Sequence, residues 1–395
     1  MKFSDEDLQR IDLWVLNKDL EDSTLKTYLQ CLKYYCNLIN LSPDELIKEA
    51  DSEEEKGIKL RDRRINLYFL KFKKQLKNDN KAESTINLYI IAVKSFYDAL
   101  DIQLPKIKTS QGDIGLEKNY GKLISREELV EFVNAAAPRE KALIYLMALS
   151  GMAQAEARNL TLRKFMDAAG EAIKKDIRTI NDLFDLKDEL KNAVITLHIT
   201  RKKVNYRYIT FIPPEATKYI IMYLKERVFG SNKKIHVKNY DSSLFVKNNG
   251  EPIDRDVIVT NFRRIGLQAG FKKNDGAYSF WRAHGMRKYF ISTIMNKLGD
   301  KVLADFLAGH KISDVDRAYW YMDPDDLKKR YMKALPYLSI DKTKVLEIKS
   351  EDYERIEELE KTQEILRKQL MKTEKTLKII EENPEILEIL NKKYE

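Results

Sequence analysis

Hydrophobic side chains recur every three or four residues through much of the first hundred positions, as they do along the buried face of a helix. Residues 24–40, 61–76 and 84–100 each carry such a series, rich in Tyr and Phe. A further helix is predicted after Ser42, because Ser42, Pro43 and Glu45 have the types and spacing of a capping residue, a first turn and a capping box. These four helices predict a small helical bundle within residues 1–110.

The pattern changes after this bundle. Residues 101–122 contain Pro, Gly and scattered Lys without a sustained period, and we interpret 111–124 as an interdomain linker. Helical periodicity resumes after the capping box of Ser125 and Glu128. The predicted helices include 139–149, 215–227, 254–269, 284–298, 301–308 and 323–334, and in or just after the last of them we expect Tyr331 and Tyr337 in the core.

Two runs of alternating β-branched residues interrupt the helices. VITLHIT at 194–200 and RYITF at 207–211 are joined by a basic segment, which predicts a β-hairpin with a basic tip. The chain is therefore expected to be mainly α with a small β-sheet, and residues 125–342 to form a mixed α+β domain.

The last segment, residues 343–395, has a heptad pattern. Six of the eight a and d positions are apolar among Ile356, Leu359, Gln363, Leu366, Leu370, Thr373, Leu377 and Ile380. Two interpretations stay open: a short coiled coil, or a single amphipathic helix folded onto its own domain.

Composition narrows the function classes. The 395 residues include 71 Lys+Arg and 62 Asp+Glu, a net charge of +9, which favours an acidic partner such as nucleic acid. Cys31 and Cys36 stand five apart on a predicted helix and should be reduced thiols, and no Cys/His pattern indicates a structural zinc. The chain lacks a signal-peptide pattern and any run of about 20 apolar residues, so we expect a cytoplasmic protein without a membrane partner.

Three short motifs carry candidate chemistry. His284 and Arg287, in HGMR, stand three apart and would share one face of a helix. His310 lies in LAGH, and the aromatic run AYWYMDP follows it, with Tyr319 nine residues after His310. Together with a lysine at the hairpin tip, these motifs in this order resemble the tyrosine recombinases, or phage-type integrases. The end of the domain, YWYMDPDDLKKRYMKALPYLSI, is similar to integrases of archaea and their mobile elements.

The resemblance covers the chain to about residue 342 and implies an architecture. It implies an N-terminal helical core-binding (SAM-like) domain, a mixed α+β catalytic domain and, beyond them, a C-terminal helical tail. It also implies a double-stranded DNA attachment site as partner, a clamp around the duplex and a homo-tetramer on paired sites.

The resemblance also implies catalytic residues. Its histidine–arginine pair falls on His284 and Arg287, its second histidine on His310 and its nucleophile on Tyr319, with Tyr321 a nearby competitor. The hairpin lysine falls on Lys202 or Lys203, with Lys203 preferred. Each assignment has a plain alternative: His284 a helix cap, Arg287 a structural ion pair, and the lysines solvated turn residues.

One catalytic position departs from the family. The first arginine of the resemblance falls on Ala153, although the acidic residue that often follows is present at Glu156. Arg158 would point about 140° away from position 153 on an ideal helix, so it is a poor replacement. Arg139 and Arg163 lie further away along the chain.

These residue types suit DNA strand cleavage. Tyr319 would attack the phosphodiester, Arg287 and His310 would hold the phosphoryl oxygens, and Lys203 and His284 would transfer protons. No cofactor or metal is required. Two interpretations remain: an active recombinase impaired by an Arg→Ala change at 153, or a naturally inactive DNA-binding relative. A generic helical DNA-binding protein would not explain the motifs together, and among integration, excision and dimer resolution the archaeal-like ending favours integration.

Overall fold

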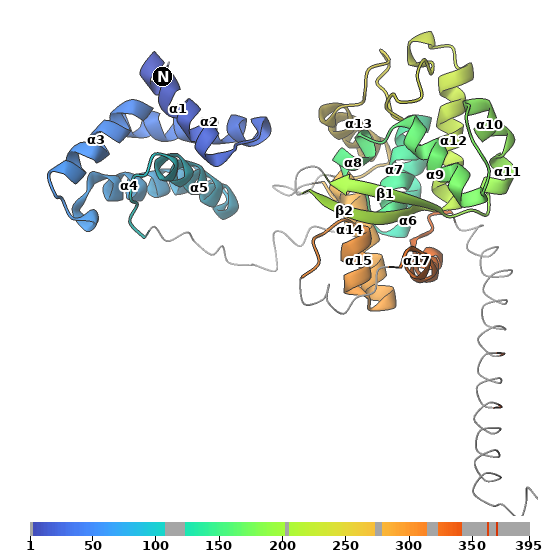
Figure 1. The fold of residues 1–395 in the computed structure, drawn as a ribbon. Helices are drawn as coiled ribbons and strands as arrows, with labels where there is room; N and C mark the ends of the chain where they lie inside the picture. The colour runs from blue at the N-terminus through green and yellow to red at the C-terminus, as the bar shows by residue number, and fades with distance from the viewer. Residues whose placement is uncertain are drawn as a thin grey trace, which may run out of the picture. The chain divides into compact units, whose positions relative to one another are not determined.

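The structure is a computed structural model that describes residues 3–106, 123–201, 205–272, 279–313 and 323–341, with Thr362 and Gln369. The chain forms two compact units, Met1–Asn119 and Tyr120–Glu395, which are described separately (Figure 1). All eight heptad positions named above lie outside the described residues. Within the described part, no helix is both long and apolar enough to cross a membrane.

The first unit is a bundle of helices. Its described elements are α1 (Asp5–Lys18), α2 (Asp22–Ile39), α3 (Pro43–Glu55), the 3-10 turn η1 (Leu60–Asp62), α4 (Arg64–Asn78) and α5 (Glu83–Ala99). The four predicted helices are present, and the capping box of Ser42 and Glu45 forms. Helix α4 starts three residues later than the pattern predicted, because η1 occupies its expected first turn.

Helix α1 was not predicted, although its signal is local. Ser4 accepts from the backbone of Asp7 and the Asp7 carboxylate accepts from the backbone of Ser4, which satisfies two N–H groups at the start of the helix. Behind that cap, Ile11 and Trp14 are buried at helical spacing. Asp7 therefore closes a complete capping box here, in the place that Glu takes at Ser42 and Ser125.

Aromatic rings fill the core of the first unit. Trp14, Tyr35, Phe72, Phe96 and Tyr97 are all buried, and Tyr35 meets Phe72 edge to face at 4.9 Å between centroids. Such pairs contribute about 0.5–1.5 kcal/mol beyond the area they bury. Cys31 and Cys36 are free thiols, and both are buried.

The second unit is mainly helical. Its described elements are α6 (Arg126–Asn134), α7 (Pro138–Ser150), α8 (Gln154–Arg158), α9 (Leu162–Ile173), α10 (Ile180–Asp185), α11 (Lys187–Leu190), β1 (Ile195–Arg201), β2 (Tyr206–Ile212), α12 (Pro214–Phe229), η3 (Lys233–Ile235), α13 (Arg255–Gln268), α14 (Ala283–Leu298), α15 (Lys301–Leu307) and α17 (Pro324–Leu338). The short helices α8, α10 and α11, and the longer α9, were not predicted from the hydrophobic pattern.

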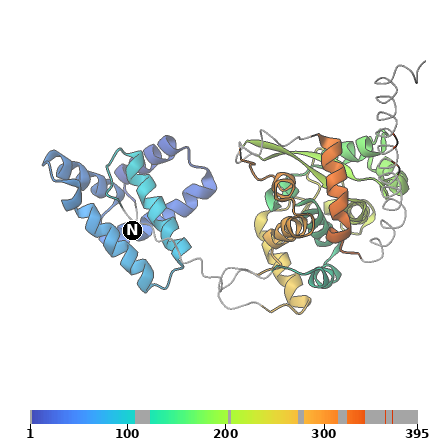
Figure 2. The same cartoon turned by 90° about the horizontal axis from the view of Figure 1, so that it is seen from below.

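The predicted hairpin forms an antiparallel pair, from Ile195 opposite Ile212 to Arg201 opposite Tyr206. Figures 1 and 2 show this pair along one side of the helices of the second unit. The fold class is therefore as expected, mainly α with a small two-stranded sheet.

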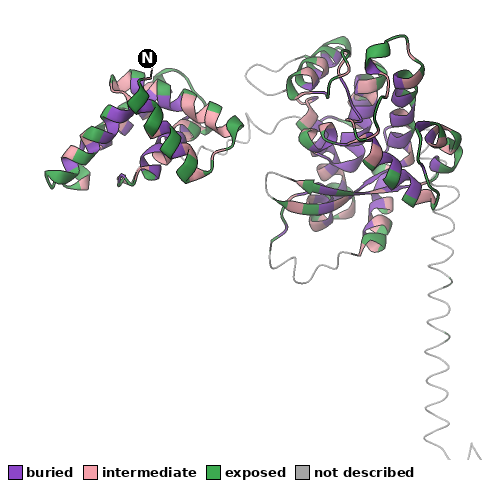
Figure 3. Cartoon of the chain, turned by 45° about the horizontal axis from the view of Figure 1, so that its top comes forward, coloured by how far each residue is buried: buried purple, intermediate pink, exposed green. Residues whose placement is uncertain are grey.

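Helix α7 is the centre of the second core. Every residue from Ala142 to Ser150 is buried, and the helix contacts α12, α14 and β2. The buried residues of this unit lie on the inward faces of its helices (Figure 3). Tyr331 of α17 is buried there as predicted, but Tyr337 is 46% exposed, so its expected core position is wrong. Tyr337 lies six positions after Tyr331 on α17, so it points to a different side of the helix, towards solvent.

Candidate active site

The buried helix α7 ends at the turn Ser150–Gly151–Met152, which lies at the site. Gly151 ends α7 in the left-handed conformation, with φ 69°. A Cβ on Gly151 would lie 2.4 Å from the ring of Phe290 in α14, so only glycine allows this approach. Thr210 of β2 donates to the Ser150 carbonyl at 2.5 Å, and Tyr331 donates to the Leu149 carbonyl at 2.7 Å. Three elements thus fix the turn.

Ala153 follows this turn and is the N-cap of α8, with extended backbone. Its N–H donates to Oε2 of Glu156 at 2.5 Å, which satisfies one of the free donors at the start of the helix. Its methyl side chain supplies neither a capping oxygen nor a charge. The backbone frame around position 153 is therefore well supported, while the side chain offers nothing to an anion.

The Glu156 carboxylate is contacted by three side chains, those of Tyr208, Arg201 and Arg287. Its side chain is buried, and Oε2 accepts from the Tyr208 hydroxyl at 3.0 Å. Nε of Arg201 lies 3.1 Å from Oε1, and Nη1 of Arg287 lies 3.8 Å from Oε2. Glu156 was expected only as a feature of the family, and Arg201 and Tyr208 were not predicted as site residues. Their place in a hairpin with a basic tip was the available signal in the sequence.

Arg287 projects from α14 into this network and is only 3% exposed. Its Nη1 donates to the Gly151 carbonyl at 2.9 Å. Burial lowers the pKa of Arg287, and the nearby Glu156 carboxylate partly offsets that effect. An arginine nevertheless stays charged at neutral pH. Among the described residues, Nη2 is buried without a hydrogen-bond partner, so the guanidinium has a free donor inside the protein.

His310 follows α15 and is held from both sides. Gly309 has φ 70°, and a Cβ there would meet the Tyr208 ring at 2.6 Å. Nδ1 of His310 lies 2.8 Å from Oδ1 of Asp305. Because an ionised carboxylate only accepts, Nδ1 carries the proton, and Nε2 is the atom left for a ligand. Arg201 donates to the Gly309 carbonyl at 2.8 Å, which connects this turn to the hairpin.

His284 begins the same helix that carries Arg287. The His284 side chain is exposed, whereas Arg287, one turn further along the helix, is buried. The two residues therefore lie on the same side of α14, one at the surface and one below it. Partial desolvation, followed by the positive charges of Arg282 and Lys288, lowers the pKa of His284. The lowered pKa favours the neutral imidazole, which is the form able to accept a proton.

Two predicted site residues lie outside the described residues. These are the nucleophile Tyr319 and the hairpin lysine, whether Lys202 or Lys203. The structure brings together three of the other candidates: the Ala153 turn, Arg287 and the Gly309–His310 turn all connect through Glu156 or Arg201. His284 takes no part in these contacts, although it lies on the same helix as Arg287. No cluster of three or more His, Cys, Asp or Glu side chains in the described part could hold a metal ion.

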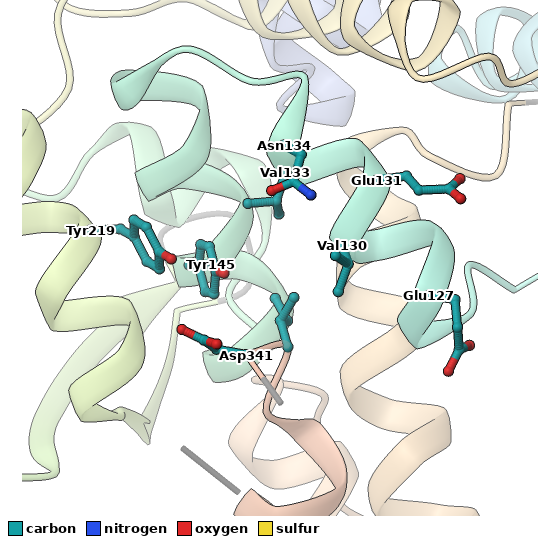
Figure 4. Close-up of a pocket in the computed structure, with 9 residues that line it drawn as sticks. Glu127, Val130, Glu131, Val133, Asn134, Tyr145, Tyr219 and Asp341 are labelled. Carbon is teal, nitrogen blue, oxygen red and sulfur yellow. The ribbon is translucent and has the colours of Figure 1, made fainter. Parts of the chain in front are cut away.

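A pocket of about 440 Å³ lies elsewhere in the second unit (Figure 4). The rings of Tyr145 and Tyr219 stack within it, with centroids 4.0 Å apart. It is lined by Glu127, Val130, Glu131, Val133, Asn134, Tyr145, Tyr219, Ile340 and Asp341. None of the catalytic candidates among the described residues lines this pocket.

Comparison with known proteins decides the family. Residues 122–326, more than half of the chain, match the phage integrase family. The chain belongs to the phage integrase family. No curated protein sequence matches it.

The fold is also similar to that of solved recombinases. A lambda integrase (75–356) dimer bound to a COC′ core site is 12% identical, with 82% of this chain and 99% of that chain covered and a TM-score of 0.51. A lambda integrase tetramer bound to a Holliday junction is 13% identical, with 80% and 76% covered and a TM-score of 0.51. The XerA recombinase is 21% identical, with 83% and 98% covered and a TM-score of 0.35. At these sequence identities, the similarity to lambda integrase shows a shared fold and nothing more.

Proposed function

We propose that this integrase-family chain is a site-specific recombinase that cleaves and rejoins DNA strands through a covalent 3′-phosphotyrosyl intermediate. The observation that supports it best is the free donor of Arg287: Nη2 is buried without a partner among the described residues, beside the Gly151 turn. A buried N–H donor without an acceptor destabilises the fold, and a ligand that accepts its hydrogen bond removes this penalty. A DNA phosphoryl oxygen is the acceptor that fits a guanidinium.

The proposed reaction is a balanced exchange at phosphorus. The Tyr319 oxygen forms a bond to phosphorus while the bond to the 5′-oxygen breaks. His284 accepts the tyrosine proton, and Lys203 protonates the leaving 5′-oxygen. Arg287 and Nε2 of His310 stabilise the negative charge that develops on the nonbridging oxygens. Attack by a 5′-hydroxyl on the phosphotyrosine reverses these steps and rejoins the strands without ATP.

We also propose that Ala153 impairs this chain. An arginine at 153 would extend from the cap of α8, where the backbone is already fixed by Glu156. Loss of one preorganised donor typically lowers the rate about 10²–10³-fold. DNA binding should persist, because phosphate contacts are spread over many residues.

The test compares this chain with Ala153→Arg on DNA duplexes selected for binding from a randomised pool. Ala153→Arg should form a covalent protein–DNA adduct, resistant to denaturation, that disappears when Tyr319→Phe is added. Ala153→Lys is the matched control, because it restores charge without the planar fork, and it should recover less activity. Absence of any adduct from Ala153→Arg on bound DNA would overturn the proposal.

The remaining assignments are proposed with it. We propose a double-stranded attachment site as partner, a tetramer on paired sites, and an archaeal mobile element integrating its DNA as the context. Residues 1–110 would be the core-binding domain, 111–124 the linker, 125–342 the catalytic domain and 343–395 the helical tail. A naturally inactive DNA-binding relative is the second candidate, favoured by Ala153; it predicts DNA binding with no adduct even after Ala153→Arg.

A further inference from the structure

Arg201 occupies a position that the reaction scheme above does not use. It is the last residue of β1, half-buried, and immediately precedes the basic tip of the hairpin. Its Nε lies 3.1 Å from Oε1 of Glu156, and its Nη1 donates to the Gly309 carbonyl at 2.8 Å. One side chain therefore joins the hairpin to α8 and to the turn that carries His310.

We propose that Arg201 is a positioning residue of the strand-cleavage site, which neutralises Glu156 so that Arg287 remains available to the phosphate and which holds the His310 turn against the hairpin. The proposal rests on the proposed function for its effect on cleavage. Its structural part, the coupling of hairpin, Glu156 and His310 turn, can be measured without DNA.

The first part of the proposal, that Arg201 neutralises Glu156, follows from the arrangement of charges. Glu156 is a buried carboxylate, and the two cations near it among the described residues are Arg201 at 3.1 Å and Arg287 at 3.8 Å. A buried carboxylate without its closest cation attracts the next one strongly. Removal of Arg201 would draw the Arg287 guanidinium towards Glu156 and away from an incoming phosphate.

The second part of the proposal, that Arg201 holds the His310 turn against the hairpin, follows from the contacts around Gly309. Gly309 packs against the Tyr208 ring, and the Tyr208 hydroxyl bonds Glu156, the same carboxylate that Arg201 contacts. Arg201 closes this ring of contacts by its bond to the Gly309 carbonyl. The next residue, His310, has its Nδ1 fixed by Asp305, so the position of Nε2 depends on where this turn lies. A displacement of about 1 Å at a reacting group lowers a rate about 100-fold.

The test uses the full chain with Ala153→Arg, so that cleavage is measurable. Arg201→Gln should lower the single-turnover cleavage rate about 100-fold while the dissociation constant for DNA stays nearly unchanged. Arg207→Gln is the matched control, because it removes the same charge from an exposed position on the partner strand of the hairpin. The control should cleave normally.

A second substitution distinguishes positioning from general packing. If Arg201 acts by neutralising Glu156, then Glu156→Gln should restore part of the rate lost in Arg201→Gln, and Arg201→Lys should retain more activity than Arg201→Gln. An equal loss with and without Glu156→Gln overturns the proposal. A weaker DNA affinity with an unchanged rate does so as well, because it marks a plain phosphate contact.

A third experiment tests the coupling without measuring DNA cleavage. In the chain with Ala153, Arg201→Gln should shift the ring-proton NMR resonances of His310, whereas Arg207→Gln should leave them in place. Unchanged His310 resonances overturn the coupling. If Ala153→Arg forms no adduct but these shifts appear, the proposed function fails and the coupling stands.

Discussion

Arg287 donates from Nη1 to the carbonyl oxygen of Gly151 at 2.9 Å. This bond joins the first turns of α14 to the end of α7, where the chain turns towards Ala153. It fixes one end of the guanidinium and leaves Nη2 buried without a partner among the described residues. A cation held in this way is preorganised for an anion, because little rearrangement remains when the anion arrives.

Replacement of Arg287 tests this relationship. In the chain with Ala153→Arg, Arg287→Gln should lower covalent adduct formation about 10²–10³-fold. DNA affinity should change little, since many other residues contact phosphates. Arg287→Lys keeps the charge but loses the fork and should also fail to recover the full rate. Single-turnover cleavage and a binding titration measure both quantities; a normal cleavage rate in Arg287→Gln would exclude a catalytic role.

Gly151 allows a stability prediction. Gly151→Ala places a Cβ against the Phe290 ring and forces a left-handed conformation on alanine, so the free energy of unfolding should fall by about 2 kcal/mol or more. Gly299→Ala is the matched control: it ends α14 with φ 68° and meets nothing within 4 Å. The control should lose only about 1 kcal/mol. Urea unfolding of both variants measures the difference, and equal losses would mean that the Phe290 contact relaxes freely.

His284 should titrate below an ordinary histidine. Desolvation and the cations Arg282 and Lys288 disfavour its charged form, so the folded-state pKa is lowered. The unfolded chain then binds the proton more readily, and stability falls as the pH drops through the unfolded-state pKa towards the folded one. Proton NMR of the ring measures the pKa directly.

Lys288→Gln supplies the control for that titration. It should raise the pKa of His284, and only partly, because desolvation is the larger cause. If His284 accepts the proton of Tyr319, the acid limb of the cleavage rate should move with it towards higher pH. A His284 pKa that does not respond to Lys288→Gln would contradict the electrostatic account.

The tail gives a prediction about assembly. If the heptad positions of 343–395 form a coiled coil between protomers, deletion of 350–395 should reduce the assembled mass in solution or on DNA. A single helix folded onto its own domain predicts an unchanged mass. Light scattering of the full and shortened chains, with and without DNA, separates the two interpretations.

Local signals in the sequence determined most of the elements. Capping boxes at Ser42 and Ser125 mark helix starts because the cap is satisfied within four residues. The alternation at 194–200 and 207–211 likewise predicted the hairpin, because side chains on a strand alternate between its faces. The same kind of signal is present at Ser4, so α1 is predictable from the sequence in principle.

The sequence also singled out position 153, the His284–Arg287 pair and His310, because their spacing along the chain is itself the motif. It gave no reason to place Arg201 on Glu156 or Tyr208 against Gly309, since these pairs are far apart in the chain. Only the packing of the hairpin beside α8 and α15 brings them together, because a strand end has no preferred partner until the core fixes its position. The sequence therefore predicted a missing charge at position 153, whereas only the tertiary structure placed Arg201 beside Glu156 and the Gly309 carbonyl.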